Sequence, residues 1–393
     1  MTVKSETILR PERFEAAPEV GDRLEQAIRG ALRAIDRNLP RFTERFPAPA
    51  SVHNVYPAMD NVEWTSSFWT GMLWLAYELT GAETYRRAAE VQLESYYRRV
   101  AERSHTDTHD LGFLYSLSCI AAYKLTRNLT ARQSALAAAE LLAERYFPKA
   151  GIIQAWGDLS DPAQRGRMII DCLMNLPLLY WAAGQSGDSR VHELAYTHAK
   201  QAARYIVRQD ASTFHTYYMD AETGAPLAGD THQGYSDDSC WARGQAWGIY
   251  GFALSYRYTG DRIFLELARC LAHYFLNRLP ADGVPYWDLI FSDGLEERDS
   301  SAAAIAVCGL LELAKLLPTD DPGRDLYRKA ALTILDSLAT NYTAADDPSV
   351  DGLLLHAVYH KSSGKGVDEC CIWGDYFYLE ALARLRKDWA LYW

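Results

Sequence analysis

Two seven-residue stretches of similar design, Leu79-Thr80-Gly81-Ala82-Glu83-Thr84-Tyr85 and Tyr258-Thr259-Gly260-Asp261-Arg262-Ile263-Phe264, decide the fold. In each, an apolar helical pattern stops at a glycine, an acid or threonine follows as a cap, and an aromatic side chain begins the next apolar face. A looser copy is Gly187-Asp188-Ser189-Arg190. These stretches predict pairs of helices that are joined by short turns.

Helical periodicity extends outward from these turns over most of the chain, and the alternation typical of strands is nearly absent. We expect twelve helices, in six pairs whose spacing is too variable for a stacked solenoid. An all-α fold follows, an (α/α)6 barrel with an inner and an outer ring of helices. The expected helices are 22–37, 66–80, 84–103, 110–126, 130–146, 168–183, 188–208, 239–258, 262–278, 299–316, 323–342 and 371–386.

The remaining connections are long and rich in residues that can do chemistry. They are expected to gather around one mouth of the ring, because long connectors inside a compact domain usually carry function. They are residues 53–64, 104–110, 151–167, 210–239, 279–299 and 341–370. No Pro- or Ser-rich linker divides the chain, so residues 1–393 are expected to form a single catalytic domain with a short N-terminal lead of about residues 1–20.

Composition excludes several classes of protein. The 393 residues carry a formal net charge of −11 without a basic block, which argues against a nucleic-acid partner. Charged residues interrupt every apolar stretch, so no membrane span is expected, and the first residues lack the apolar core of a secretory signal. Seven cysteines without CxxC spacing indicate a reducing cytoplasm. The 48 aromatic residues (11 Trp, 25 Tyr and 12 Phe) are enough to line a sugar-binding cleft.

Asp171 is the strongest candidate for a catalytic acid. It lies in the apolar run Met168-Ile169-Ile170-Asp171-Cys172-Leu173-Met174-Asn175, which we expect to be helical. Burial would raise the pKa of its carboxyl group and keep it protonated, as a general acid requires. Asn175, one turn further on, can supply a hydrogen bond. The alternative is a buried aspartate that caps a neighbouring helix, but a lone buried acid is costly without a function.

Asp110 is expected to begin a helix in His109-Asp110-Leu111-Gly112-Phe113, where it could serve simply as a cap. The preceding run from His105 to Asp110 superficially resembles a metal site. It crosses a junction of loop and helix, however, and the sequence contains no HExxH spacing. We therefore expect no metal.

A third cluster runs from His232 to Trp247. Ser239 is expected to cap a helix on which Arg243 and Trp247 lie one turn apart on one face. A guanidinium group beside an indole suits an anionic ring substrate, because arginine can hold a carboxylate while tryptophan covers the sugar. The pair could also be a cation–π contact without a ligand. GxSxG, P-loop and GxGxxG motifs are absent from the sequence.

Through the motifs around Asp110, Asp171 and Arg243, the sequence resembles the unsaturated glucuronyl hydrolases, glycoside hydrolase family 88, over about residues 54–385. The resemblance also includes Val62-Glu63-Trp64-Thr65-Ser66-Ser67-Phe68-Trp69-Thr70-Gly71 and Ser239-Cys240-Trp241-Ala242-Arg243-Gly244-Gln245-Ala246-Trp247. It implies an (α/α)6 barrel that releases a Δ4,5-unsaturated uronic acid from the non-reducing end of lyase-generated oligosaccharides. It also implies that the enzyme hydrates the C4=C5 enol ether, with no metal or organic cofactor.

The resemblance assigns roles to particular residues. Asp171 would protonate C4 and then activate water for C5, and Asp110 would be the second essential carboxylate. The positions that match substrate-contacting residues of the family are Trp64, Trp156, His215, Gln233, Trp241, Arg243 and Trp247. Members that prefer sulfated glycosaminoglycan disaccharides carry a Ser/Lys segment, which Ser363 and Lys365 match here, although His360 stands where another serine is expected.

Other functions fit part of the pattern. The unsaturated rhamnogalacturonyl hydrolases of family 105 share the fold and the chemistry, but the string from Trp241 to Trp247 favours the glucuronyl group. A sugar epimerase on an α/α barrel would use histidines as bases, and a non-catalytic sugar-binding protein would not need Asp171. The expected partners are unsaturated uronyl disaccharides and oligosaccharides, bound by a cytoplasmic monomer or weak homo-oligomer.

Overall fold

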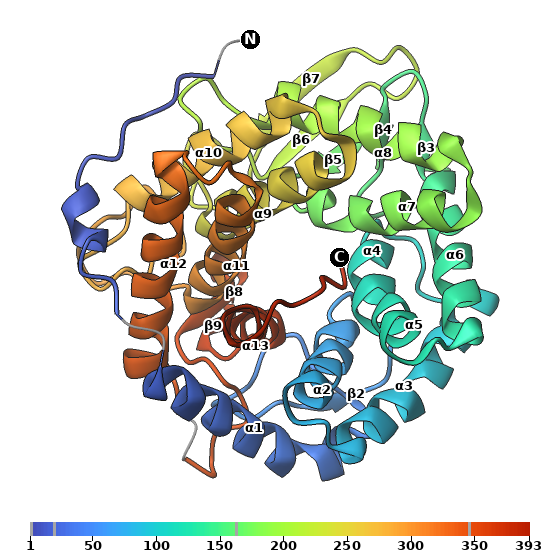
Figure 1. Ribbon diagram of the computed structural model, residues 1–393. Helices are drawn as coiled ribbons and strands as arrows, with labels where there is room; N and C mark the ends of the chain where they lie inside the picture. Colours follow the sequence, from blue (N-terminus) through green and yellow to red (C-terminus); the bar gives the residue numbers. More distant parts are fainter. Residues whose placement is uncertain (1–2, 19–20, 162–163, 345–346) are drawn as a thin grey trace.

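Two concentric rings of helices make up the computed structural model, which describes residues 3–18, 21–161, 164–344 and 347–393 (Figure 1). The described residues form twelve helices, counting α4, a π-helical turn (Ser116–Ile120) and α5 as one continuous helix. The inner helices are α2 (Ser66–Thr80), α4 (Leu111–Tyr115) with α5 (Ala121–Thr126), α7 (Cys172–Ser186), α9 (Ala242–Thr259), α11 (Ser300–Leu316) and α13 (Ile372–Arg386). The outer helices are α1 (Asp22–Phe42), α3 (Glu83–Ala101), α6 (Leu129–Glu144), α8 (Ser189–Gln201), α10 (Arg262–Asn277) and α12 (Pro322–Asn341).

Each inner helix packs against one outer helix, which gives the six expected pairs. The inner ring closes where α13 packs on α2, so segments from opposite ends of the sequence lie side by side (Figure 1). Inner helices are buried almost all round; on α9, every residue from Ala242 to Ser255 is buried. The predicted (α/α)6 barrel is confirmed. The expected helix boundaries hold within about four residues, with two exceptions. Helix α1 continues to Phe42 rather than ending at residue 37, and the helix expected at 188–208 is α-helical only to Gln201, after which a π-helical turn runs to Ile206.

The short turns form as the sequence predicts. Gly81, Gly187 and Gly260 end inner helices with φ of 71°, 77° and 70°, a left-handed conformation that glycine adopts without steric cost. Asp188 and Asp261 then cap the next helix by accepting a backbone hydrogen bond. The first junction differs, because Ala82 is the N-cap there and makes no side-chain bond.

The long connections carry the strands that the sequence did not reveal. Nine short strands pair antiparallel in four small sheets within the described residues. The strands are β1 (Phe46–Pro47), β2 (Ala58–Met59), β3 (Tyr146–Phe147), β4 (Ile152–Ile153), β5 (Arg167–Ile169), β6 (Thr216–Met219), β7 (Pro226–Asp230), β8 (Ala357–His360) and β9 (Lys365–Glu369). All nine lie between one outer helix and the next inner helix. We call this side of the ring the mouth end, and the side of the short turns the far end.

The segment 389–393 fills the axis of the ring, where Figure 1 marks the C-terminus. The side chains of Trp389, Leu391, Tyr392 and Trp393 are all buried. Trp393 stacks on Phe377 of α13 with ring centroids 5.8 Å apart, and its edge meets Phe113 of α4 at 5.9 Å. This segment therefore links α13 to α4, two inner helices that α2 separates in the ring.

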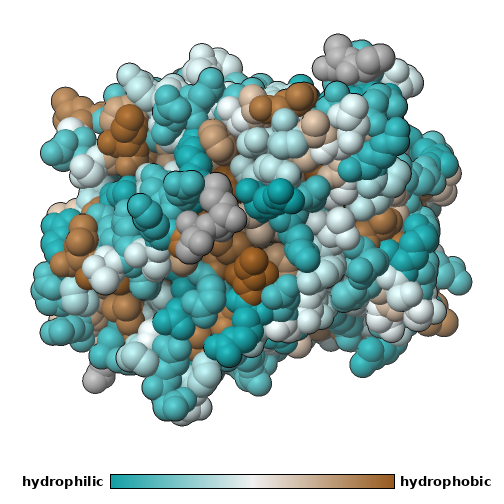
Figure 2. All heavy atoms as spheres, turned by 90° about the horizontal axis from the view of Figure 1, so that it is seen from above, coloured by the Kyte–Doolittle hydropathy of each residue, from teal (hydrophilic) through white to brown (hydrophobic). Residues whose placement is uncertain are grey.

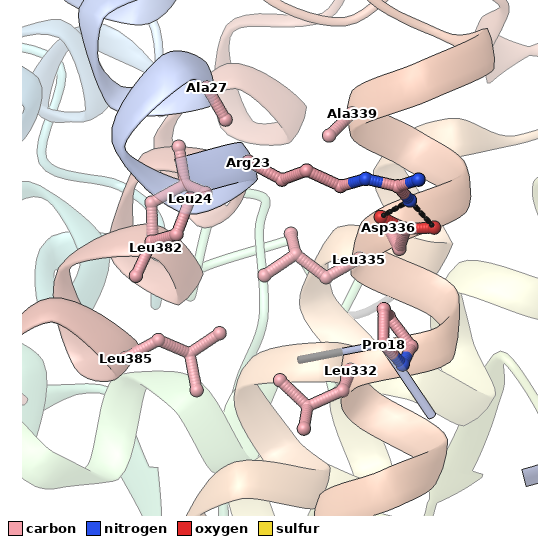
Figure 3. Close-up of a pocket in the computed structure, with 10 residues that line it drawn as sticks. All are labelled: Pro18, Arg23, Leu24, Ala27, Leu332, Leu335, Asp336, Ala339, Leu382 and Leu385. Carbon is pink, nitrogen blue, oxygen red and sulfur yellow. Dashed lines mark hydrogen bonds and ion pairs between the residues drawn. The ribbon is translucent and has the colours of Figure 1, made fainter. Parts of the chain in front are cut away.

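The outside of the ring offers little to a hydrophobic partner. On the side shown in Figure 2, hydrophilic side chains cover most of the surface and hydrophobic ones form small separate groups. A small apolar pocket of about 40 Å³ lies between α1, α12 and α13, with leucines on its walls and the Arg23–Asp336 ion pair at its edge (Figure 3). None of the helices in the described residues combines the length and the hydrophobicity that a membrane span requires.

Candidate active site

A cavity of about 500 Å³ opens at the mouth end, where the inner helices begin. Side chains from five of the long connections line it, together with Arg99 of α3 and Asp171 at the start of α7. They are Val62, Glu63, Trp64, Arg99, His105, Asp107, Thr108, His109, Asp110, Trp156, Asp171, His232, Gln233 and Tyr359. Because helix N-termini carry free N–H groups and partial positive charge, this end of the ring suits an anionic ligand.

Asp110 and Asp171 occupy the same position on adjacent inner helices, since each is the N-cap of its helix, α4 and α7. The helices approach closely at Gly112, where a Cβ atom would lie 2.2 Å from the Cα of Asn175. Asn175 then links the two acids, because its amide nitrogen donates to Asp110 Oδ1 at 3.3 Å and to the backbone oxygen of Asp171 at 3.4 Å. The sequence Asp110-Leu111-Gly112 therefore brings both carboxylates to one wall of the cavity.

The helix expected to start at residue 168 begins instead at Cys172, so the prediction for residues 168–171 was wrong. Met168 and Ile169 belong to β5, which pairs with β6, and their apolar side chains are buried by that sheet. A short buried strand and a buried helix can have the same apolar composition, and this explains the error. Asp171 gains from the change, because a cap position points its carboxylate out of the helix.

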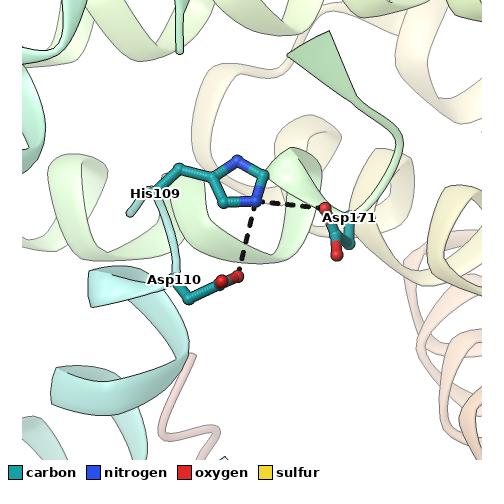
Figure 4. A group of neighbouring side chains, drawn as sticks. All are labelled: His109, Asp110 and Asp171. Carbon is teal, nitrogen blue, oxygen red and sulfur yellow. Dashed lines mark ion pairs between the residues drawn. The ribbon is translucent and has the colours of Figure 1, made fainter. Parts of the chain in front are cut away.

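His109 lies between the two acids (Figure 4). Its Nε2 atom is 3.4 Å from Asp110 Oδ1 and 3.3 Å from Asp171 Oδ1. Burial raises the pKa of Asp110, and the neighbouring Asp171 adds to this effect. Burial alone would lower the pKa of His109, but the two carboxylates outweigh it and the pKa is raised. Asp171 is therefore not the lone buried acid that the sequence suggested.

These three side chains also have the spacing that a metal site would require. One atom from each lies within 4.8 Å of the others. Two carboxylates and one imidazole are a ligand set that divalent metals accept. Only one of the two imidazole nitrogens faces the acids, and the sequence argues against a metal for the reasons given above.

Trp64 and Trp156 form aromatic walls of the cavity, as expected of sugar-binding residues. Trp64 stacks on Trp373 with centroids 5.3 Å apart, and its indole N–H donates to the hydroxyl of Tyr359. The guanidinium group of Arg167 lies 4.7 Å from the centre of the Trp156 ring. Both rings are held from behind, so their free faces are fixed in the cavity.

Gln233 is the third predicted binding residue on the cavity wall. Its Oε1 atom accepts a hydrogen bond of 2.6 Å from Arg243 Nη2. This contact turns the amide so that its N–H₂ group remains available as a donor. Arg243 therefore fixes which end of Gln233 a ligand can meet.

Arg243 does not line the cavity among the described residues. The side chain is 1% exposed and forms an ion pair with Asp299, which is fully buried, at 3.0 Å. It also donates to the backbone oxygens of Val358 and Tyr359. Both terminal nitrogens of the guanidinium thus donate to protein groups, so Arg243 supports the wall of the cavity from behind.

The predicted pairing of Arg243 with Trp247 was wrong. The indoles beside the guanidinium are Trp241 and Trp373, at 4.5 and 4.9 Å, whereas Trp247 packs between Phe113 and Phe377 in the core. Ser239 does not cap α9 either, because Trp241 is the N-cap and Ser239 Oγ bonds Asp288. The helix starts three residues later than expected, so Arg243 lies in its first turn and reaches the long connections, whereas Trp247 lies one turn further into the ring.

His215 and Trp241 also lie behind the cavity wall, with their rings 4.4 Å apart. His215 Nδ1 accepts hydrogen bonds from the backbone N–H groups of His232 and Gln233. Burial holds the pKa of His215 well below its usual value, so the ring remains a neutral acceptor. Its contacts shape the loop that presents Gln233.

Ser363 and Lys365 lie on the exposed hairpin of β8 and β9, beside the cavity. Ser363 Oγ bonds Nδ1 of His360, whose Nε2 lies 2.8 Å from the backbone oxygen of His232. Lys365 Nζ lies 4.5 Å from the centre of the Tyr359 ring. Neither residue lines the cavity; Lys365 contacts Tyr359 on its wall, and Ser363 is linked to the wall residue His232 through His360.

Sequence reasoning passed over several residues of this wall, above all His109 and Tyr359. In the sequence, His109 belongs only to the run from His105 to Asp110 that superficially resembles a metal site, and its neighbour Asp110 was the stronger candidate for a catalytic role. Tyr359 gave no signal, because one tyrosine among 25 cannot be told from core packing. Its position depends on the hairpin, which the helical pattern does not reveal.

Comparison with known proteins decides the family. The model of Glycosyl Hydrolase Family 88 matches residues 34–311. The chain belongs to this family of glycoside hydrolases. It is 51% identical to the "Unsaturated chondroitin disaccharide hydrolase" of Streptococcus pneumoniae, over 100% of this chain and 99% of the relative.

Solved structures of unsaturated glucuronyl hydrolases have the same fold as this chain. An unsaturated glucuronyl hydrolase from Streptococcus agalactiae matches with a TM-score of 0.97 and 48% identity, over 100% of this chain and 99% of that one. An aspartate-to-asparagine mutant of that enzyme, complexed with dGlcA-GalNAc6S, matches with a TM-score of 0.90 and 46% identity, again over 100% and 99%. Sequence and structure thus agree over the whole ring.

Proposed function

We propose that this protein is an unsaturated glucuronyl hydrolase acting on glycosaminoglycan-type fragments. It would release the Δ4,5-unsaturated uronic acid at the non-reducing end by hydrating the C4=C5 double bond. The observation that carries this proposal is the pair Asp110 and Asp171 on adjacent helix N-termini, facing one cavity between Trp64 and Trp156. The names of its relatives, which refer to chondroitin disaccharides and to dGlcA-GalNAc6S, support the same substrate class.

The proposed reaction needs one acid that can also act as a base. Asp171 protonates C4, and the positive charge that develops at C5 is stabilised by the nearby carboxylates. The Asp171 carboxylate then takes a proton from water as the water oxygen bonds to C5. The resulting hemiketal opens to a ketone, and the exposed hemiacetal at C1 expels the remaining sugar as an alcohol.

Substrate binding would combine stacking with hydrogen bonds. The faces of Trp64 and Trp156 suit the faces of sugar rings, and the free amide N–H₂ of Gln233 suits an oxygen of the uronate. We assign Arg243, His215, Trp241 and Trp247 to positioning, because their contacts fix this wall from behind. Ser363 and Lys365 would meet the second sugar, from the rim.

Loss of the ultraviolet absorbance of an unsaturated uronyl disaccharide tests this function. We expect the absorbance to disappear with a chondroitin-derived disaccharide and to persist with a rhamnogalacturonan-derived one. Deuterium from solvent is expected at C4 of the product, since a carboxyl proton exchanges with water before transfer. Absorbance that stays constant with the chondroitin substrate, or a product without deuterium at C4, contradicts the proposal.

We further propose that residues 1–393 act as one catalytic unit, as a monomer or weak homo-oligomer in the cytoplasm. The lead, described over residues 3–18, supports the first point because Glu6 pairs with Arg278 beside α10. All seven cysteines are free and buried, which supports a reducing compartment. Sedimentation at several protein concentrations tests the oligomeric state, and fractionation of cells tests the location.

A further inference from the structure

His109 is the one cavity residue that contacts both carboxylates. We propose that it is a positioning residue whose Nε2 group holds Asp110 and Asp171 together and compensates their charge when both are ionised. The proposal rests on the function given above, because it assigns these acids to the reaction. It adds a third member to the pair, acting through the acids rather than on the sugar.

The imidazole ring is firmly held. The side chain is 2% exposed, and its backbone N–H donates to the oxygen of Ala155 at 2.6 Å. The backbone oxygen of His109 accepts from Gly112 in the first turn of α4. The backbone that carries the imidazole is therefore fixed next to Asp110, and the side chain extends from there toward α7.

Only one edge of the ring has polar contacts. Nδ1 is buried without a hydrogen-bond partner among the described residues, and so is Oδ1 of Asp171, which stands 3.3 Å from Nε2 in a poorly aligned contact. Unpaired buried atoms of this kind are costly, and they persist where function requires them. The contact between Nε2 and this unpaired carboxylate oxygen is therefore one that can tighten when substrate and proton arrive.

The charges around the ring support the same role. Asp110 and Asp171 face it from α4 and α7, while Arg145 and His198 act on it from the outer helices. Burial holds the pKa of His198 at about 3, so this ring is neutral. Arg145 is turned to the backbone oxygens of Gln154 and Gly157. His109 is thus the group placed to balance the two acids.

This arrangement has a consequence for each half of the reaction. Before proton transfer, the proposed reaction requires a proton on Asp171, and the N–H beside it keeps this carboxyl group directed into the cavity. After transfer both carboxylates are ionised, and their repulsion at this separation would oppose the step. The single N–H of Nε2, which faces one oxygen of each carboxylate, lowers that cost.

Two substitutions separate positioning from packing. His109→Ala removes the ring, whereas His109→Gln returns an N–H donor near the place of Nε2. We expect kcat of the alanine variant to fall roughly 100-fold with KM within about threefold, and glutamine to restore about tenfold of this loss. His192→Ala, on outer helix α8 and in contact with Tyr180, is the matched control and should keep full activity. Circular dichroism verifies that each variant is folded.

The pH profile provides the readout that packing alone would not move. A donor beside a carboxylate favours its ionised form, so its removal raises the pKa of the pair. The limb on which activity is lost with rising pH should therefore move up by about one pH unit in His109→Ala, and less in His109→Gln.

Two results overturn the proposal. Equal loss in both variants with an unmoved limb would mean that the ring only fills space. Loss of wild-type activity on chelation, restored by Zn²⁺ alone, would make His109 a metal ligand instead. Failure of the proposed function is distinguishable, because the wild-type protein would then leave the disaccharide absorbance unchanged.

Discussion

The two ends of the inner ring bury the same kinds of acid in opposite ways. At the far end, Glu312 and Glu380 are fully buried, and each of their four oxygens has a hydrogen-bond donor. Arg384 pairs with both of them, Arg257 with Glu312, and Trp393 and Tyr250 donate to Glu380. At the mouth end, Asp110 and Asp171 share a single imidazole.

The difference shows what each end is for. Compensated acids fix one geometry, because removing either partner leaves an uncompensated buried charge. Acids left short of positive charge keep the capacity to hold and release a proton. Of these two pairs, the compensated one stabilises the far end and the uncompensated one is free for chemistry at the mouth end, where the Arg243–Asp299 ion pair is a compensated neighbour.

The largest effect is expected from Asp171→Asn, which should lower kcat by at least about 10²–10⁴-fold. Asparagine has nearly the same shape but cannot deliver a proton to carbon. Thermal stability should stay unchanged or rise, since the cost of burying a charge disappears. Turnover of an unsaturated disaccharide and a melting curve measure both; a variant with most of its activity would remove Asp171 from the mechanism.

Glu312→Gln at the far end should have the opposite effect to Asp171→Asn, lowering stability while leaving activity nearly unchanged. The substitution leaves Arg257 and Arg384 short of a counter-charge in a buried network, so we expect a loss of about 3–5 kcal/mol in the free energy of unfolding. The kcat of the folded enzyme should remain within about twofold. Denaturant unfolding and the activity assay check these two outcomes, and a catalytic defect without destabilisation would break the comparison.

Asp375 tests whether an uncompensated acid at the mouth end can be structural. Burial raises the pKa of its carboxyl group to about 7, while its oxygens accept from Tyr56 and from the backbone of Leu353 and Leu354. The folded state therefore binds the proton more tightly, and wild-type stability should fall as pH rises from about 4 to 7.

Asp375→Asn lacks this titration and keeps similar acceptors. Its stability relative to wild type should increase through that pH range by at most about 4 kcal/mol and stay level above it. Unfolding in urea at several pH values gives the difference. A difference that stays level or narrows from pH 4 to 7 would show that folding does not raise the pKa of Asp375.

The smallest effect is expected at the rim. Lys365→Ala should reduce kcat/KM on a sulfated disaccharide about two- to fivefold more than on the unsulfated one, the range of an exposed ion pair. The difference should shrink as salt rises, because exposed charges are screened. Equal losses on both substrates at low salt would mean that the hairpin does not meet the sulfate.

The scaffold was predictable because its signals are local. Gly81, Gly187 and Gly260 mark the ends of inner helices in the sequence and adopt the left-handed conformation in the structure. The strands were not predictable, since β5 pairs with β6 almost 50 residues away and is only three residues long. Such pairs depend on the ring that brings them together.

The site was predictable in part. Asp110, Asp171, Trp64, Trp156 and Gln233 lie on the cavity as expected. Arg243 could not be placed from its motif, because its partner Asp299 is 56 residues away and the backbone oxygens of Val358 and Tyr359 are 115 and 116 residues away. The role proposed for His109 could not be inferred from the sequence, because it depends on the close approach of α4 and α7 in the folded structure.

Closure of the ring by α13 and residues 389–393 has a consequence for synthesis. Helix α2 packs against a partner that is translated roughly 300 residues later, which takes about 15–60 s at typical rates. During that time the apolar faces of the inner helices have no permanent cover. The nascent chain is thus expected to depend on chaperones, and to complete its inner ring only after residue 393 has left the ribosome.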